Sequence, residues 1–283
     1  MSSIVERMTQ TSDAAVGAGR GRGSSPGRVS AIARNTFREA VRDRILYNLV
    51  LFVLLLSVSA IFLGAASASQ DAKIIVDLGL SATLLFGAFI AVFVGVGLVW
   101  KEIERRTVYA IFAKPVGRGE FLVGKYLGLC GTLALNVVVM GVGVTLVLAY
   151  VVRGTTPLLL ALWPTVALIY LELTVLTGVA LLFSAFSSPI LALFGSLAVF
   201  LIGHFTAELK GFATLFDDAV VRGALVALYY ALPNLSTFSQ ITPAAYGIAP
   251  PPAHLAVALA YAVAWDVALL AGATLLFARR DFR

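Results

Sequence analysis

The sequence predicts an all-α fold, a polytopic membrane helix bundle with six transmembrane helices. Hydrophobic residues make up 60% of the 283-residue chain. Charged residues make up only 13%, whereas soluble domains carry about 25%. A membrane-crossing helix needs about 20 mainly apolar residues, and six stretches meet this requirement. They are residues 45–64, 78–100, 126–152, 158–186, 189–207 and 254–278.

The distribution of Lys and Arg predicts the orientation of these spans. With six crossings both termini lie on one side of the membrane, and 17 of the 21 Lys and Arg residues fall on that side. Basic residues concentrate in cytoplasmic segments of membrane proteins. We therefore expect a multi-pass protein of the cytoplasmic (inner) membrane with both termini in the cytoplasm. This topology explains the formal charge of +6, so no nucleic-acid partner is expected.

Two segments precede the first span. Residues 1–28 contain few large apolar side chains and are expected to form a disordered basic leader, followed by a six-helix transmembrane domain over residues 29–283. From Val29 to Ile45, apolar residues recur at helical spacing with charged residues opposite. This pattern predicts an amphipathic helix on the cytoplasmic surface of the membrane, in contact with lipid. Alternatively, the segment extends the first span into the cytosol.

The long outer loop, residues 208–253, contains the apolar stretch AVVRGALVALYYAL. This stretch is short for a span and contains Arg222, so it predicts a partly inserted or re-entrant outer helix between spans five and six. Five of the ten prolines lie in this loop, which predicts a stiff, irregular second half.

Two acidic residues, Glu172 and Asp266, lie within predicted spans. An ionisable group at the bilayer centre costs roughly 2.5–3.5 kcal/mol on insertion scales and normally faces protein or water. The two residues either hydrogen bond between helices or line a translocation path. The chain has a single cysteine and two histidines, so no metal site is expected.

The stretch GRGEFLVGKY, residues 117–126, resembles a nucleotide-binding P-loop in its spacing, G-x-x-x-x-G-K from Gly119 to Lys125. Tyr126 stands where a P-loop has the Ser or Thr that binds Mg²⁺. We therefore expect that this chain binds neither ATP nor Mg²⁺. The surrounding loop, residues 101–125, has a charged end and an apolar turn. It fits either a docking element for a soluble partner or a solvated connector.

The pattern E-x-E-x-x-T followed by A-K-P-V-x-R-x-E-F-x-x-G-K-Y-x-G resembles the loop of ABC-type permeases of the type-2 exporter class. The similarity is strongest to the permeases of nitrous-oxide-reductase maturation and gliding-motility transporters, and it extends over nearly everything after residue 30. The resemblance implies that residues 101–125 couple the chain to an ATPase. The coupling residues are then Glu102, Glu104, Arg105, Arg106, Thr107, Phe112, Lys114, Pro115, Arg118, Gly124 and Lys125.

The resemblance further implies a transporter subunit that is not itself an enzyme. Two such permeases, expected here as a homodimer, pair with two separate ATPase subunits, which bind the ATP and Mg²⁺. An ion-coupled secondary transporter using Glu172 and Asp266 is the alternative from another class, although no convincing internal repeat supports it. An intramembrane serine protease is a further alternative, but no G-x-S-x-G elbow is present.

Overall fold

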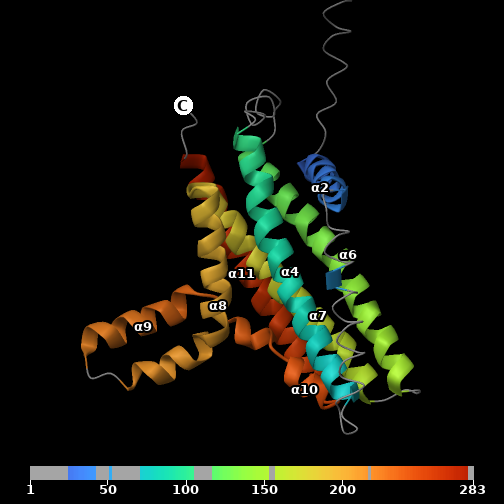
Figure 1. Ribbon diagram of the computed structural model, residues 1–283. Coiled ribbons are helices and arrows are strands. Elements are labelled where there is room, and N and C mark those ends of the chain that lie inside the picture. The colour runs from blue at the N-terminus through green and yellow to red at the C-terminus, as the bar shows by residue number, and fades with distance from the viewer. Residues whose placement is uncertain are drawn as a thin grey trace, which may run out of the picture.

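The computed structural model describes residues 25–42, 51–52, 71–104, 117–152, 157–215 and 218–279, and every regular element within them is helical. Five of these helices are long and apolar enough to cross a membrane. They are α4 (Asp71–Glu104), α6 (Arg118–Val152), α7 (Pro157–Phe186), α8 (Pro189–Ala213) and α11 (Pro252–Arg279). They run together as a bundle (Figure 1) and correspond to five expected spans. The remaining expected span, residues 45–64, lies outside the described residues apart from 51–52.

Helices α4 and α6 are longer than the expected spans. With 34 and 35 residues and a rise of 1.5 Å per residue, each is about 50 Å long, whereas the hydrocarbon core of a bilayer is about 30 Å thick. α4 begins at Asp71 rather than near residue 78, and α6 begins at Arg118 rather than near residue 126. The expected boundaries were too short because hydropathy marks only the apolar part of a helix.

Helix α7 is the centre of the bundle. In its apolar stretch 72% of the residues are buried, against 17% in α11. One side of α7 shares a hydrophobic core with α4 and α6, and another side shares a second core with α8 and α11. The sequence favours this position because α7 is apolar around its whole circumference, as expected for a helix surrounded by others.

Small residues and buried hydroxyl groups allow the long helices to approach one another. A Cβ atom at Gly79 of α4 would lie 2.7 Å from Val144 of α6, and one at Gly178 of α7 would lie 3.1 Å from Leu269 of α11. Such small residues are typical of packed transmembrane helices. Hydroxyl groups within the helices donate to the carbonyl four residues earlier, which satisfies them without water. Examples are Thr83, Thr132, Thr165, Thr177, Ser196 and Thr274.

A separate helix, α2 (Ser25–Arg42), lies beside α6 and is steeply inclined to the long helices (Figure 1). It begins within the last residues of the expected leader. Its apolar face packs against α6, with Thr36 and Ala40 buried, while Arg34 and Arg38 are exposed. The apolar side of this helix therefore has a protein partner in addition to any contact with lipid.

The opposite end of the bundle carries α9 (Ala219–Ala231), the 3-10 helix η1 (Leu235–Phe238) and α10 (Ile241–Ala245). The end of α8 and the whole of α9 project sideways from the bundle (Figure 1), and α9 has no buried residue. Helix α9 meets the segment Leu235–Ala245 at 47°. The hydroxyl of Tyr261 accepts a hydrogen bond from the backbone N–H of Asn234 (2.7 Å), which ties this connection to α11.

Candidate functional site

The structure divides the predicted coupling residues into three groups. Glu102 and Glu104 belong to the last turn of α4, and Arg118, Gly124 and Lys125 belong to α6. The other predicted coupling residues lie outside the described residues. They are Arg105, Arg106, Thr107, Phe112, Lys114 and Pro115. The predicted loop 101–125 is thus shorter than expected, because both of its ends are helical.

A capping arrangement explains why α6 starts at Arg118. Gly117 precedes the helix, and its carbonyl accepts the first helical hydrogen bond, from Phe121 (3.1 Å). The Glu120 carboxylate reaches back to the backbone N–H of Gly117 (3.2 Å). This is the glutamate half of a capping box, and a negative charge in the first turn also stabilises the helix dipole. The signal was present in the sequence as G-x-x-E at residues 117–120.

Glu120 also joins α6 to α2. Arg28 of α2 donates two hydrogen bonds to this carboxylate, from Nε (3.0 Å) and from Nη2 (2.8 Å). The hydrogen bonding raises the pKa of Arg28 further above its usual range. Bidentate pairs of this kind fix the relative orientation of both side chains. Sequence analysis missed the pair because residues 28 and 120 belong to distant segments.

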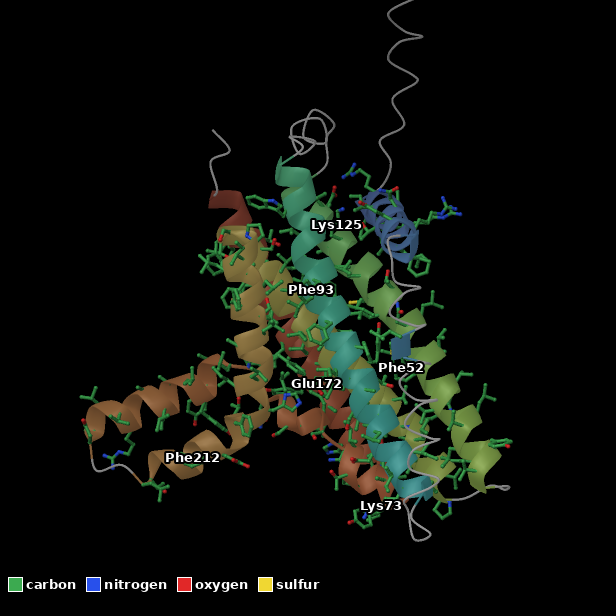
Figure 2. All side chains as sticks on the ribbon, in the orientation of Figure 1. Phe52, Lys73, Phe93, Lys125, Glu172 and Phe212 are labelled. Atoms are coloured by element: carbon green, nitrogen blue, oxygen red, sulfur yellow. The ribbon has the colours of Figure 1, made fainter. Side chains whose placement is uncertain are left out.

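The glycines of the P-loop-like stretch are used for helix packing. A Cβ atom at Gly119 would lie 3.3 Å from Thr274 of α11, and one at Gly124 would lie 2.7 Å from Ile32 of α2. Lys125 is buried, with Nζ 5.7 Å from the ring centre of Phe121, and Figure 2 shows it on α6 near α2. The spacing that resembles a P-loop therefore has a structural use in bringing α2 and α11 close to α6.

Glu172 lies inside the bundle (Figure 2) and faces helix α8. Its side chain is only 1% exposed, and Oε1 lies 3.2 Å from Nε2 of His204. The other ring nitrogen of His204, Nδ1, is 2.9 Å from the carbonyl oxygen of Phe200. The histidine thus joins Glu172 of α7 to the backbone of α8.

Asp266 has a different set of neighbours. The side chains of Tyr126 from α6 and Thr174 from α7 lie near its carboxyl group, although the Thr174 hydroxyl donates to the Leu171 carbonyl (2.7 Å). Oδ1 lies 3.6 Å from where a Cβ at Gly178 would be. The two acids therefore contact different helices. Both alternatives, in which Glu172 and Asp266 hydrogen bond between helices or line a translocation path, stay predictions.

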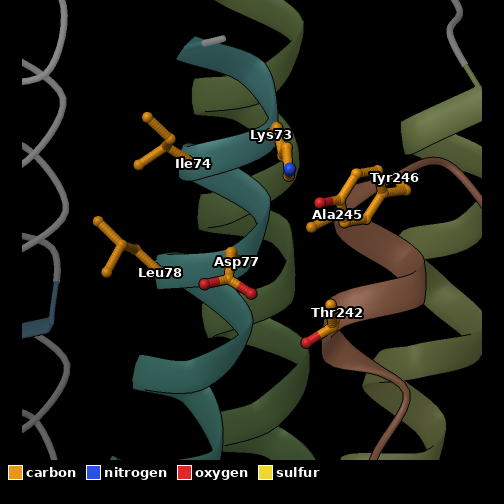
Figure 3. A pocket seen from close by; sticks show the side chains of 7 residues that line it. All are labelled: Lys73, Ile74, Asp77, Leu78, Thr242, Ala245 and Tyr246. Carbon is orange, nitrogen blue, oxygen red and sulfur yellow. The ribbon is translucent and has the colours of Figure 1, made fainter. Parts of the chain in front are cut away.

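A pocket of about 340 Å³ lies between α4 and α10, at the end of the bundle that carries α10. Lys73 of α4 extends toward Tyr246, which follows α10, and the Lys73 Nζ lies 3.5 Å from the centre of the tyrosine ring (Figure 3). Asp77 and Thr242 add polar groups to the same pocket. This contact between a cation and an aromatic face ties α4 to the connection that leads into α11.

Together, the apolar helices define a multi-pass membrane protein. Residues 30–282 match the family model of the ABC-2 family transporter proteins. The chain therefore belongs to the ABC-2 transporter family, whose members are membrane permease components of ABC transporters. This confirms the resemblance found in the 102–125 pattern.

One relative shares part of the chain. Over 104 residues the chain is 31% identical to a protein of Pseudomonas aeruginosa described as a probable ABC transporter permease protein NosY. The match covers 35% of this chain and 38% of that protein.

Proposed function

We propose that this chain is the permease subunit of an ATP-binding-cassette exporter that moves a substrate across the cytoplasmic membrane. A separate ATPase subunit supplies the energy by docking on the 101–125 stretch, and ATP and Mg²⁺ bind to that subunit. A second copy of the chain completes the membrane part, and two ATPase copies serve the pair. Family membership supports the permease role, and the dimensions of α4 and α6 support the docking position.

The observation that carries the docking proposal is the length of α4 and α6. Each is longer than the hydrocarbon core is thick, by about 20 Å. Residues 101–125 are called the coupling stretch, and the end of α4 and the start of α6 that belong to it lie at the end of the bundle where α2 lies (Figure 1). Glu104 ends α4 and Arg118 begins α6 at that end of the bundle. A soluble partner can reach residues in that position.

The proposed topology has six crossings and cytoplasmic termini. Three described features gather at one end of the bundle, namely α2, the turn between α7 and α8 at Ser187–Ser188, and the end of α11 (Figure 1). The Lys and Arg distribution assigns this end to the cytoplasm. The sixth crossing is residues 45–64, α2 lies at the cytoplasmic surface, and α9 with the segment Leu235–Ala245 forms a re-entrant outer element.

Substitutions in the coupling stretch test the docking proposal. Glu104→Arg and Phe112→Asp are expected to leave the protein inserted in the membrane but to abolish co-purification of the ATPase. Truncating one member of a buried charge pair at an interface costs about 2–5 kcal/mol, and loss of an apolar anchor costs a similar amount. Arg20→Ala, in the leader, is the control and is expected to retain the ATPase. Retention of the ATPase and of full activity in both loop variants would show that the loop is a solvated connector.

A further inference from the structure

Helix α2 contacts the first half of α6 at three successive levels, with the same spacing on both helices. Arg28 pairs with Glu120, Ile32 lies against Gly124, and Thr36 lies against Gly128. Each step is four residues on α2 and four residues on α6. Matching rows of this kind are how two helices pack closely along a shared face.

The two glycine levels allow little relative movement. A Cβ atom at Gly124 would lie 2.7 Å from Cβ of Ile32 and 3.2 Å from the Val29 carbonyl oxygen. At Gly128, a Cβ would lie 2.6 Å from the Ala33 carbonyl oxygen. Because these carbonyls belong to the backbone of α2, the two helical backbones are in close contact. Thr36 is completely buried in this seam.

The ion pair between Arg28 and Glu120 holds the third contact level, at the first residues of α2 and α6. Both side chains are partly shielded, at 30% exposure for Arg28 and 19% for Glu120. The Glu120 carboxylate also accepts the hydrogen bond from Gly117, at the point where the chain enters α6. One carboxylate therefore fixes both the start of α6 and the beginning of α2.

From this geometry we propose that α2 and residues 117–132 of α6 are one rigid unit of the coupling apparatus, with Glu120 as its positioning residue. The proposal rests on the proposed function, because the unit is placed where the coupling stretch joins α6. Docking of an ATPase then moves α2 and α6 together, and the Arg28–Glu120 pair keeps the start of α6 in a fixed position relative to α2.

A cross-linking experiment tests whether the unit is rigid. Arg28→Cys and Glu120→Cys are combined in a Cys130→Ala background and joined by a short bifunctional thiol reagent. The readout is ATP hydrolysis per assembled complex, measured with the ATPase subunits in lipid vesicles. Without reagent, activity is expected to fall by about two- to fivefold, the range for loss of a partly exposed ion pair. With the reagent, activity is expected to return to the level of the Cys130→Ala background.

A second pair of variants covers the case in which the double-cysteine protein does not assemble. Arg28→Met removes the ion pair but keeps the Glu120 cap, and the matched control Arg34→Met changes an exposed arginine of the same helix. Arg28→Met is expected to lower ATP hydrolysis per complex at unchanged ATPase co-purification, and Arg34→Met is expected to leave it unchanged. A purely stabilising role would lower the amount of complex and not its turnover.

The outcomes separate the two proposals. If the unchanged chain neither binds nor affects an ATPase, the proposed function fails. If the unchanged chain couples normally but the cross-linked protein is inactive, α2 must move relative to α6 and the rigid-unit proposal alone is overturned. Full activity in Arg28→Met would also overturn it, because the ion pair would then position nothing.

Discussion

Glu172, which is buried, and His204, whose side chain is 25% exposed, form a pair that links α7 to α8, with Oε1 and Nε2 3.2 Å apart. The carbonyl oxygen of Phe200, which can only accept a hydrogen bond, lies 2.9 Å from Nδ1 of the histidine. Nδ1 therefore carries a proton, and Nε2 faces the glutamate. Nε2 and Oε1 can bond only through a proton that one of them carries, so the link depends on both residues.

Removing the histidine is expected to destabilise the bundle more than removing both partners. In His204→Leu, Glu172 loses its partner while remaining buried, which costs about 3–5 kcal/mol when the group is charged. Glu172→Leu with His204→Leu leaves two apolar side chains and is expected to recover part of the loss. Thermal unfolding of the detergent-solubilised protein measures both variants. A double variant less stable than His204→Leu would contradict this account of the pair.

The close seam between α2 and α6 predicts a sharp contrast between two glycines. Gly128→Leu places a side chain where the Ala33 carbonyl and Thr36 of α2 now lie, whereas a Cβ at Gly223 of α9 would meet no other part of the described structure within 4 Å. Gly128→Leu is therefore expected to displace α2 and to loosen its helical backbone, so that trypsin cleaves after Arg34 and Arg38, whose side chains are already exposed. Gly223→Leu should leave the cleavage pattern unchanged. Equal protection of α2 in both variants would show that the seam tolerates a side chain.

Asparagine and leucine at position 266 distinguish the two roles considered for Asp266. Asp266→Asn keeps a polar group beside the Tyr126 hydroxyl and is expected to preserve both stability and permease-dependent ATP hydrolysis. Asp266→Leu removes that polar neighbour, at a cost of about 1–3 kcal/mol, whereas the Thr174 hydroxyl keeps its bond to the Leu171 carbonyl. Thermal unfolding and ATP hydrolysis are measured together. A stable but inactive Asp266→Asn protein would favour a role in the translocation path.

Cysteine labelling in intact cells tests the topology. Ser3→Cys and Arg283→Cys, each in a Cys130→Ala background, are expected to react with a membrane-impermeant thiol reagent only after the cells are opened. Tyr246→Cys is the control for the outer side, because Tyr246 is 63% exposed at the end of the bundle that the proposed topology places outside. Labelling of either terminal cysteine in intact cells would refute the proposed orientation.

Hydropathy located the five described spans because a lipid environment requires about 20 consecutive apolar residues, a signal that lies within each segment. The start of α6 was placed too late, since its first turns are polar and are stabilised by the Glu120 cap and by Arg28. The sequence pattern G-x-x-E indicates that cap, whereas no pattern in the sequence indicates that Arg28 pairs with Glu120.

The neighbours of the buried acids could not be obtained from the sequence in the same way. Glu172 and Asp266 were identified because charged residues are rare within apolar spans. Their partners, His204 for one and Tyr126 with Thr174 for the other, come from different helices. Packing across the bundle, through contacts such as Gly178 against Leu269, decides which helices are neighbours. The periodicity of a single segment does not indicate its neighbouring helices.

Helix α11 has one narrow buried stripe and a wide apolar circumference. Ala258, Ala262, Leu269 and Ala273 are buried, and Asp266 lies on the same stripe. Turning the helix by a third of a revolution would carry the Asp266 carboxyl group into acyl chains, at a cost of roughly 2.5–3.5 kcal/mol. This aspartate therefore opposes rotation of a helix whose remaining circumference is mostly apolar. A change in bilayer thickness can tilt α11, but the carboxyl group opposes its rotation.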